Sequence, residues 1–510
     1  MLFALFPLTD TDIWWHLACA REWVTTWTPV RTPVVNVHEY FQVVVAFVYG
    51  VGGAPLLVAF KAVLWGAVFA LFVRGVRHGE LPKNVIASPV GAWQSLVAIL
   101  LIFIFRYHFE IRPVLFTLLF LGIYWKILPS ILAIRYCELL SRACHERSVE
   151  AAISRSRLVL EMVLVFAIQW LWCKCQGLYI LGPLFALLVL VAFIRESRRA
   201  GEKLSLKAVA WRVAFVLVLF AMPFLHREGL SLFLYPFGLL DRLLGLTPSA
   251  AVFASQIAEN RSPFTLLLAG ENTLECALMI LLCIAGMGFA MWRLFQDRRP
   301  DVLNVSLLVT AILALVAERN FVLFLPVLFG SFYSKCNLGF HSSLLSVKND
   351  CSKKTLLITN HCLLPTVYFL LPTFFILGLW ARSLSAYDYS MVSYQRVPVD
   401  AANWMRQNPH AGRLFNDDRA GGYLAFVNPA DSIYMDGRFI LKTADFFERY
   451  LEYAKNPSQF LADADSLNID RALFPLRYYA RWDSLLQALE TAPRWHLAYR
   501  DDYFVVFDKF

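Results

Sequence analysis

The run APLLVAFKAVLWGAVFALFV, residues 54–73, decides the class of fold. At 1.5 Å per residue, a helix of this length covers about 30 Å, which is the thickness of the hydrocarbon core of a bilayer. Apolar runs of similar length occupy residues 113–134 and 363–380. The chain of 510 residues is 58% hydrophobic and 17% charged, whereas soluble domains are about one quarter charged. The sequence therefore predicts a membrane protein with several spans.

Shorter or interrupted apolar segments complete the set of predicted spans. They lie at residues 85–105, 157–175, 177–194, 208–225, 273–292, 302–317 and 321–333. Counting the partial apolar start MLFALFPL, we predict a mostly α fold, a polytopic bundle of about eleven transmembrane helices with a short first one. Because eight residues reach about 12 Å as a helix, either a fuller first span lies upstream of Met1, which we favour, or the segment inserts only partway into the membrane.

The distribution of Lys and Arg orients this bundle. One alternating set of connecting loops carries 21 of these residues, and the other set carries 8. Loops rich in Lys and Arg tend to stay in the cytoplasm. The loop around residues 9–40 and everything after residue 380 are therefore predicted to face outward. The net charge of +9 follows from these loops, so we expect no nucleic-acid partner.

The composition changes at residues 381–396, where the long apolar runs end. We predict a transmembrane bundle over 1–380, a linker over 381–396 and a soluble extracytoplasmic α/β domain over 397–510. In that domain the pattern indicates strands at GRLFN, SIYMDGR and RALFP and a closing hairpin in WHLAYRDDYFVVFDK. Helical segments alternate with these strands, which favours a small α/β sandwich.

Polar side chains gather at the predicted outer ends of the spans. In TDTDIWWH, residues 9–16, Asp10 and Asp12 stand beside two tryptophans. Ionisable groups at membrane depth pair with one another or face a cavity, so we predict a polar cavity here. Carboxylates could act as a general base or hold a divalent cation. Trp14 and Trp15 could stack on a sugar ring or belong to the interfacial aromatic belt.

A resemblance to a known family narrows the function. DTDIWWHLACAREW and the following NVHEYF resemble the first outer loop of bacterial multi-span proteins related to the C-type (GT-C) membrane glycosyltransferases. RPVLFTLLFL, WCKCQGLYILG, ERNFVLF, GRLFNDDRAGGYL and YMDGRF are similar to further stretches, so the resemblance covers nearly the whole chain. It implies hexosyl or pentosyl transfer from a polyprenyl-phosphate sugar donor to an envelope glycan or lipid, at the outer face of the bacterial inner membrane.

The resemblance also implies roles for single residues. Asp10 or Asp12 would act as the catalytic base. Residues at further motif positions would bind substrate: Trp14, Trp15, His16, His38, Glu39, Arg112, Gln176, Arg319 and Asn320. Among these, the two arginines and Asn320 are expected to hold the donor phosphate. The resemblance identifies no resident cofactor, and a divalent cation could assist the carboxylates.

Two other functions fit the same pattern. The first is a non-catalytic scaffold or binding protein for envelope glycans or lipids that keeps the fold. The second is a transporter, for which inverted repeats or paired broken helices are typical. The sequence shows neither of these two features, so it favours the transferase and then the scaffold.

Overall fold

The computed structural model describes residues 1–31, 34–75, 89–133, 149–201, 204–297, 302–331, 358–477 and 480–510. Five helical segments of this part are long and apolar enough to cross a membrane. They are formed by α2 (Glu39–Gly75), by α4 (Val114–Ala133), by η3 (Gly177–Ile180) with α7 (Leu181–Arg199), by α8 (Leu206–Ala221) with η4 (Met222–Leu225), and by α12 (Thr273–Asp297). The number becomes six if α9 (Gly229–Leu244) and α10 (Pro248–Gln256), bent by 66°, form one span.

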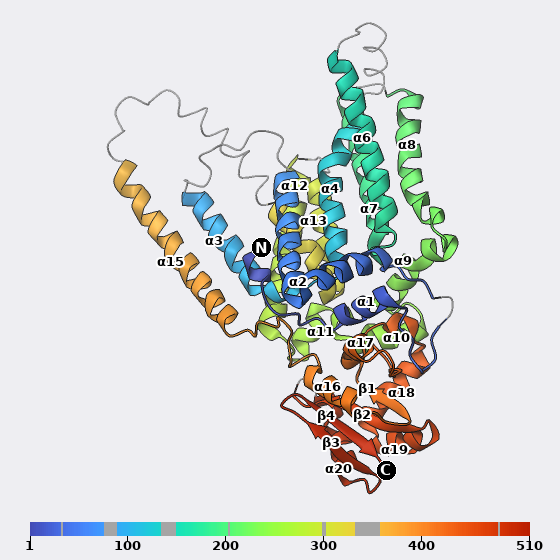
Figure 1. The fold of residues 1–510 in the computed structure, drawn as a ribbon. Coiled ribbons are helices and arrows are strands. Elements are labelled where there is room, and N and C mark those ends of the chain that lie inside the picture. The colour runs from blue at the N-terminus through green and yellow to red at the C-terminus, as the bar shows by residue number, and fades with distance from the viewer. Residues whose placement is uncertain are drawn as a thin grey trace.

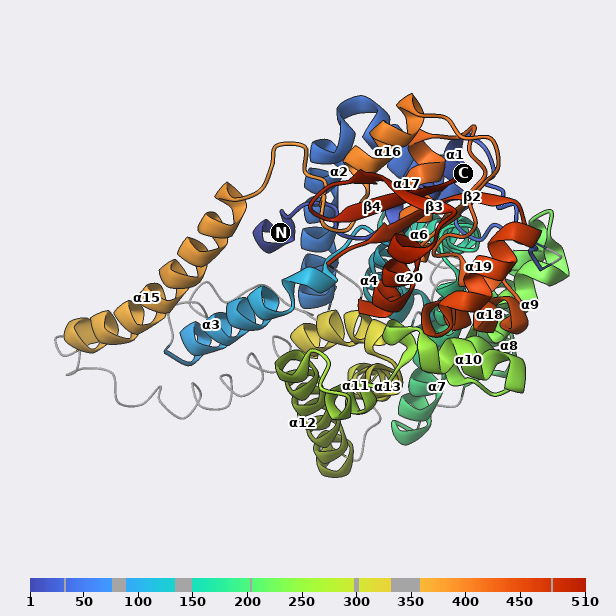
Figure 2. The same ribbon diagram turned by 90° about the horizontal axis from the view of Figure 1, so that it is seen from below.

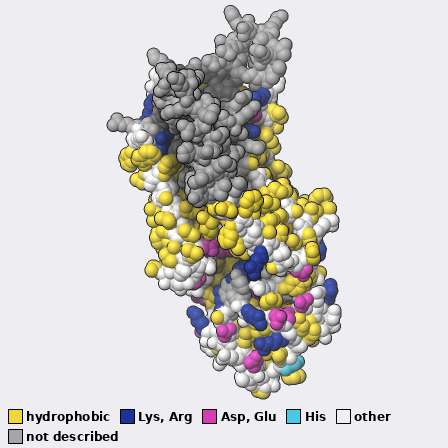
Figure 3. Space-filling model, turned by 90° about the vertical axis from the view of Figure 1, so that its left-hand side faces the viewer, with side chains coloured by type: hydrophobic (Ala, Val, Ile, Leu, Met, Phe, Trp, Pro, Cys, Tyr) yellow, Lys and Arg dark blue, Asp and Glu magenta, His cyan; other side chains and the backbone are white. Residues whose placement is uncertain are grey.

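The remaining predicted spans are helical as well. They correspond to α3 (Pro89–Ile104), α6 (Val149–Trp172), α13 (Val302–Val316), residues 321–331 and α15 (Ile358–Ser385). The apolar start forms a short helical turn, η1 (Leu2–Ala4), followed by extended chain. Hydrophobic side chains cover the helical part of the surface, and charged ones lie mainly below it (Figure 3). The prediction of a mostly helical membrane protein is confirmed.

The tail forms the predicted small α/β domain (Figure 1). Its sheet has the order β1-β2-β4-β3, in which β1 and β2 are parallel and the other neighbours are antiparallel. The strands are β1 (Arg413–Asn416), β2 (Ile469–Pro475), β3 (Trp495–Arg500) and β4 (Phe504–Lys509). The helices are α16 (Val399–Gln407), α17 (Asp418–Val427), α18 (Ala444–Lys455), α19 (Pro457–Ser466) and α20 (Asp483–Thr491).

One predicted strand is wrong. SIYMDGR, residues 432–438, forms an irregular segment with a single bridge from Ile433 to Thr26. The segment pairs with the first loop of the chain instead of the sheet. Short elements complete the fold: α1 (Asp12–Arg21), α11 (Pro263–Leu268), η2 (Arg106–His108), η3 (Gly177–Ile180), η4 (Met222–Leu225), η5 (Ala258–Asn260), η6 (Glu318–Asn320), η7 (Phe439–Leu441) and η8 (Ala480–Trp482).

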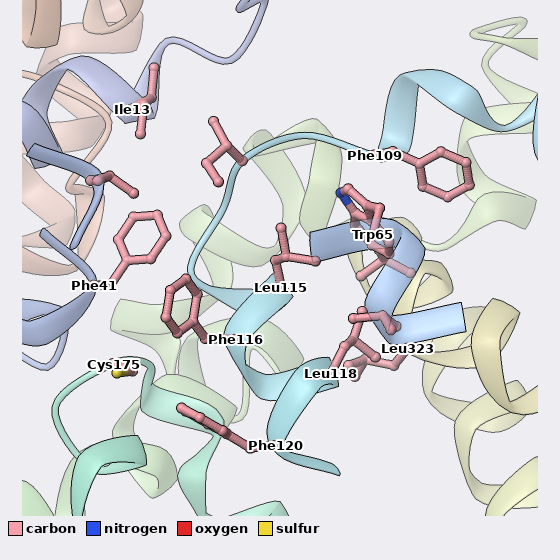
Figure 4. Packing of buried hydrophobic residues seen from close by; sticks show 14 of the residues in the cluster. Ile13, Phe41, Trp65, Phe109, Leu115, Phe116, Leu118, Phe120, Cys175 and Leu323 are labelled. Carbon is pink, nitrogen blue, oxygen red and sulfur yellow. The ribbon is translucent and has the colours of Figure 1, made fainter. Parts of the chain in front are cut away.

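A buried apolar cluster joins the first loop to the bundle (Figure 4). Ile13 from α1 and Phe41 from α2 lie on one side of it, and Leu115 and Phe116 from the start of α4 lie between them and Trp65. This packing places the chain just before α4 beneath the first loop. That chain segment carries Arg112.

The C-terminal domain packs directly on α1, and α1 and α17 lie side by side in both ribbon views (Figures 1 and 2). Two neighbouring glycines of α17 make this approach close. A Cβ atom on Gly422 would lie 3.0 Å from the backbone nitrogen of Trp15, and one on Gly421 would collide with the carbonyl oxygen of Met435. The Gly pair is therefore a packing device between α1, α17 and the segment around Met435.

We predict that Gly421→Ala destabilises the protein by about 1–3 kcal/mol, because the added methyl group meets backbone that cannot move aside cheaply. The matched control is Gly288→Ala in α12, where a Cβ meets nothing within 4 Å and helix propensity favours Ala by about 0.5–1 kcal/mol. Thermal unfolding in detergent should show a lower Tm than wild type for Gly421→Ala and no decrease in Tm for Gly288→Ala. Equal Tm values for the two variants would contradict the packing role.

Candidate functional site

Asp10 is held in an ion pair with Arg112. Its side chain is 2% exposed, and the guanidinium donates from Nε to Oδ2 and from Nη2 to Oδ1, each over 3.0 Å. The third nitrogen, Nη1, donates to Oε2 of Glu259 over 2.8 Å. Burial alone would raise the pKa of Glu259, but the charge of Arg112 lowers it to about 2. One arginine thus joins two carboxylates from distant parts of the chain.

Asp12 has different surroundings. It is the first residue of α1, and its Oδ1 accepts a hydrogen bond from Nε1 of Trp15 over 3.1 Å. The same oxygen lies against Gly437, at a place where a Cβ atom would collide with it. Burial and the neighbouring Asp10 raise the pKa of Asp12 to about 7, against the charge of Arg112. Asp12 can therefore take up and release a proton near neutral pH.

The two tryptophans serve different contacts. Trp14 is 1% exposed and lies edge-on to Tyr423, with 4.8 Å between ring centroids. It also packs against Tyr49 of α2, so its contacts are protein contacts within the bundle–domain interface. Trp15 donates to Asp12, and the guanidinium of Arg438 lies 5.5 Å from its ring. Trp15 therefore orients the carboxylate of Asp12.

His16 and His38 lie behind Trp15. Their ring centroids are 5.2 Å apart, and Nδ1 of His38 lies 3.2 Å from the carbonyl oxygen of Cys175. Burial lowers the pKa of His16 well below its usual value and that of His38 to about 4. Both rings are neutral at pH 7. The two rings pack against Trp15 and carry no charge that could act on a bound substrate.

Glu39 and Gln176 belong to a second cluster. Nζ of Lys174 lies 2.9 Å from a carboxylate oxygen of Glu39 and 2.6 Å from one of Glu228. Oε1 of Gln176 accepts from the backbone of Gly177 over 2.5 Å and caps η3. Among the residues that the structure describes, no hydrogen bond or ion pair joins Glu39 or Gln176 to the Asp12 side.

Arg319 and Asn320 are adjacent in η6 and differ in exposure. Arg319 is exposed, and its Nη1 donates to Oδ1 of Asn260 over 3.0 Å. Within the described ranges, no carboxylate oxygen lies within 4.0 Å of its guanidinium. Asn320 is buried, and its Nδ2 donates to the carbonyl oxygen of Leu313 at the end of α13. Arg319 can bind an anion, whereas Asn320 stabilises a helix end.

The sequence reasoning did not assign Lys61 and Glu110 to the site. Nζ of Lys61 lies 3.6 Å from Oε2 of Glu110 and donates to the carbonyl oxygen of Phe6 over 3.1 Å. Oγ1 of Thr9 also donates to Glu110. The pair therefore fixes the extended chain that leads into Asp10. A lysine inside the apolar run 54–73 is the signal that could have identified it.

A divalent cation does not fit the described carboxylates. No group of three or more His, Cys, Asp and Glu side chains in the described ranges converges in the way that a metal site needs. Both oxygens of Asp10 already accept from Arg112, and Glu259 accepts from the same arginine. The arginine occupies the place that a cation would take between these acids.

The fold is similar to that of known glycosyltransferases. No protein family model matches the chain, and no curated protein matches it. The apo crystal structure of the oligosaccharyltransferase from Archaeoglobus fulgidus matches with a TM-score of 0.50 and 14% identity, covering 92% of this chain and 66% of the other. The archaeal oligosaccharyltransferase AglB from the same organism, in complex with an inhibitory peptide and a dolichol-phosphate, matches with a TM-score of 0.48 and 13% identity over the same shares.

A further similar structure is ArnT from Cupriavidus metallidurans in the apo state, with a TM-score of 0.38, 12% identity and coverage of 99% of this chain and 95% of that one. The chain spans about two thirds of the length of the oligosaccharyltransferases that it matches. The chain therefore shares the fold of the oligosaccharyltransferase from Archaeoglobus fulgidus, and it has helices long and apolar enough to cross a membrane.

We predict that Arg112→Met destabilises the protein by about 3–5 kcal/mol, because it leaves the carboxylate of Asp10 buried without a counter-charge. The matched control is Arg261→Met, which removes the partner of the half-exposed Glu271 and should cost at most about 1 kcal/mol. Adding Asp10→Asn to Arg112→Met should restore part of the loss, and a double-mutant cycle of Tm values measures the coupling. Additive effects would refute the ion pair.

Proposed function

We propose that the protein is a membrane glycosyltransferase that uses Asp12 as general base. It transfers a hexosyl or pentosyl group from a polyprenyl-phosphate donor to an envelope glycan or lipid at the outer face of the membrane. The observation that carries the proposal is the contrast within D-x-D: Asp10 is committed to Arg112, whereas Asp12 is half-buried, is oriented by Trp15 and has a pKa of about 7.

The reaction is a single displacement. Asp12 removes the proton from a hydroxyl or amide of the acceptor, and the resulting nucleophile forms a bond with the anomeric carbon of the sugar. The bond from that carbon to the phosphate oxygen breaks, and its electron pair leaves with the polyprenyl phosphate. Attack opposite to the leaving group inverts the anomeric configuration. A base whose pKa lies near the working pH is suited to this proton transfer.

Arg319 is the side chain proposed to bind the donor phosphate. It is exposed beside Asn260, which adjoins Glu259. A guanidinium can hold two phosphate oxygens at once and stabilise the charge that develops on the leaving group. Arg112 was predicted for the same role, but its three donor nitrogens already bond to Asp10 and Glu259. We therefore assign Arg112 to positioning.

The shared fold supports this proposal. The apo structure of the oligosaccharyltransferase from Archaeoglobus fulgidus has this fold, with a TM-score of 0.50. The resemblance of residues 10–23 to the first loop of GT-C relatives points to the proposed donor class. A transferase needs a general base, whereas a scaffold or binding protein does not. A carboxylate with a pKa near 7 beside an orienting tryptophan therefore favours the transferase over the scaffold.

We predict that Asp12→Asn lowers transfer by a factor of about 10²–10⁴, the usual contribution of a general base. The assay supplies radiolabelled polyprenyl-phosphate sugars and envelope acceptors to the purified protein in detergent. Asp445→Asn, at an exposed position of α18, is the matched control and should keep full activity. Undiminished transfer in Asp12→Asn would reject the mechanism. Absence of transfer by the wild type with every donor would favour the scaffold, and substrate counterflow in vesicles would reveal a transporter.

The pH dependence of the rate provides a second prediction. Asp12 must be ionised to accept a proton, and its pKa is raised to about 7. The rate should therefore fall about tenfold per pH unit below pH 7 and level off above it. Single-turnover transfer measured between pH 5 and 9 checks this. A profile that stays flat down to pH 5 would show that Asp12 keeps an ordinary pKa and would contradict the assigned surroundings.

A further inference from the structure

The exposed side of helix α9 is entirely apolar. The helix belongs wholly to the described part of the chain, and none of its exposed residues is charged or polar. The large side chains among them are at least 42% exposed and follow one another at intervals of three or four residues: Leu230, Leu234, Phe237, Leu240 and Leu244. This spacing places them on one face of the helix. We call this face the apolar stripe.

The two charged side chains of α9 stand in its last turn, and both are bound by the protein. Arg242 is buried, and its Nη1 and Nη2 donate to the carbonyl oxygens of Phe439 and Lys442 over 2.6 and 2.9 Å. Asp241 accepts from the backbone nitrogen and Oγ1 of Thr247. A helix between protein and water shows charged residues on its outer side and apolar ones inside. The outer side of α9 has the opposite character and suits contact with hydrocarbon.

The apolar stripe continues a surface that is apolar enough to face lipid. Helices α8 and η4 together form the membrane-capable segment Leu206–Leu225, whose last two residues, Phe224 and Leu225, are exposed. Helix α9 follows along the same edge of the molecule (Figures 1 and 2). The exposed residue in the turn between them is Arg227, and a positive charge at this level suits the anionic groups of lipid headgroups.

Both ends of α9 lie on the same side of the predicted membrane. The helix starts where the segment Leu206–Leu225 ends, and its last turn is tied to the C-terminal domain through Arg242. Helix α10 then packs on α18 of that domain, where the rings of Phe253 and Phe447 stack with 5.0 Å between centroids. A transmembrane span needs its two ends on opposite sides. Helices α9 and α10, bent by 66°, therefore do not form a sixth span.

The bend after α9 marks a change of surface. Gly245 ends the helix in a left-handed conformation, with a φ of 62°. Beyond the bend, the exposed residues of α10 include Ser249, Ser255 and Gln256. Polar side chains of this kind are costly to place in hydrocarbon. The boundary between lipid and water is therefore expected at the bend, with α9 on the lipid side and α10 in water.

The inner side of α9 is tied to the walls of the candidate site. The hydroxyl of Tyr179 in η3 donates to the carbonyl oxygen of Leu232 over 2.6 Å. Through Arg242, the same helix holds residues 439 and 442, which follow the turn that contacts Asp12. The depth of α9 in lipid therefore sets the height of this part of the C-terminal domain above the membrane.

We propose that α9 is a membrane-surface helix. Its axis runs along the membrane plane, and its apolar stripe lies among the acyl chains of the leaflet on the side of the C-terminal domain. Amphipathic helices of this kind bury their apolar face about 5–10 Å into the boundary between headgroups and acyl chains. The partner of this surface is thus the lipid itself, and the helix connects the lipid surface to the segment beside Asp12.

Depth-dependent fluorescence quenching tests this on the full-length protein in nanodiscs of phosphatidylethanolamine and phosphatidylglycerol. Leu234→Cys places a bimane label in the middle of the apolar stripe, and the signal of wild type treated with the same reagent is subtracted. The quencher is a doxyl group at carbon 5 or carbon 12 of a lipid acyl chain. We expect the shallow quencher to act about twofold more strongly than the deep one, because the stripe lies close to the headgroups.

Three matched labels calibrate the measurement. Leu217→Cys, at an exposed position within α8, should be quenched more strongly by the deep group than by the shallow one. Leu497→Cys on β3 and Ser255→Cys on α10 are exposed as well. Neither quencher should reach these two labels, because both positions lie on the water side of the bend.

Two outcomes would overturn the proposal. Stronger quenching of Leu234→Cys by the deep group would mean that α9 enters the membrane core as part of a span. Absence of quenching would mean that the apolar stripe faces water or another protein. Leu240→Cys repeats the measurement at a second position of the stripe, should Leu234→Cys not fold. The assay uses no sugar donor, so its result is independent of the proposed function.

Discussion

Two parallel hydrogen bonds join the guanidinium of Arg112 to the carboxylate of Asp10, each 3.0 Å long. Arg112 precedes α4, and its third nitrogen holds Glu259 in η5. A bidentate pair of this kind fixes direction as well as distance. It connects the first loop, the start of α4 and the segment after α10, and it thereby fixes Asp10 and Glu259 relative to each other. The buried Lys61–Glu110 pair fixes the residues just before Asp10 in the same way.

The first loop is also a structural part of the C-terminal domain. After α1, the backbone of Trp27 donates to the carbonyl oxygen of Ile433, and that of Arg31 donates to the carbonyl oxygen of Leu441. Residues 433 and 441 therefore take backbone partners from the opposite end of the chain. A displacement of the domain from the bundle would disturb α1 and Asp12 together. The domain is in this sense a wall of the site.

The sequence pattern within single segments predicted most helices and strands. The conformation of residues 432–438 and the difference between the two D-x-D acids depend on contacts with distant parts of the chain. Long apolar runs identified the helices, and short apolar runs between polar residues identified β1, β2 and the closing hairpin, because both signals lie within one segment. SIYMDGR has the composition of a strand, but residues 26–31 compete with the sheet for its backbone. Likewise, D-x-D identified the region of the site, yet which acid is free depended on Arg112, about 100 positions away.

Asp10 and Asp12 have different surroundings, because Arg112 holds Asp10 and the C-terminal segment at Gly437 lies against Asp12. Both oxygens of Asp10 accept hydrogen bonds from the guanidinium of Arg112. Asp12 lies two residues on, where Gly437 lies against its Oδ1. Burial and the charge of Asp10 favour the neutral acid and raise its pKa to about 7. A Cβ atom at position 437 would collide with Oδ1 of Asp12, so the glycine of the D-G-R turn allows this segment to approach the carboxylate closely.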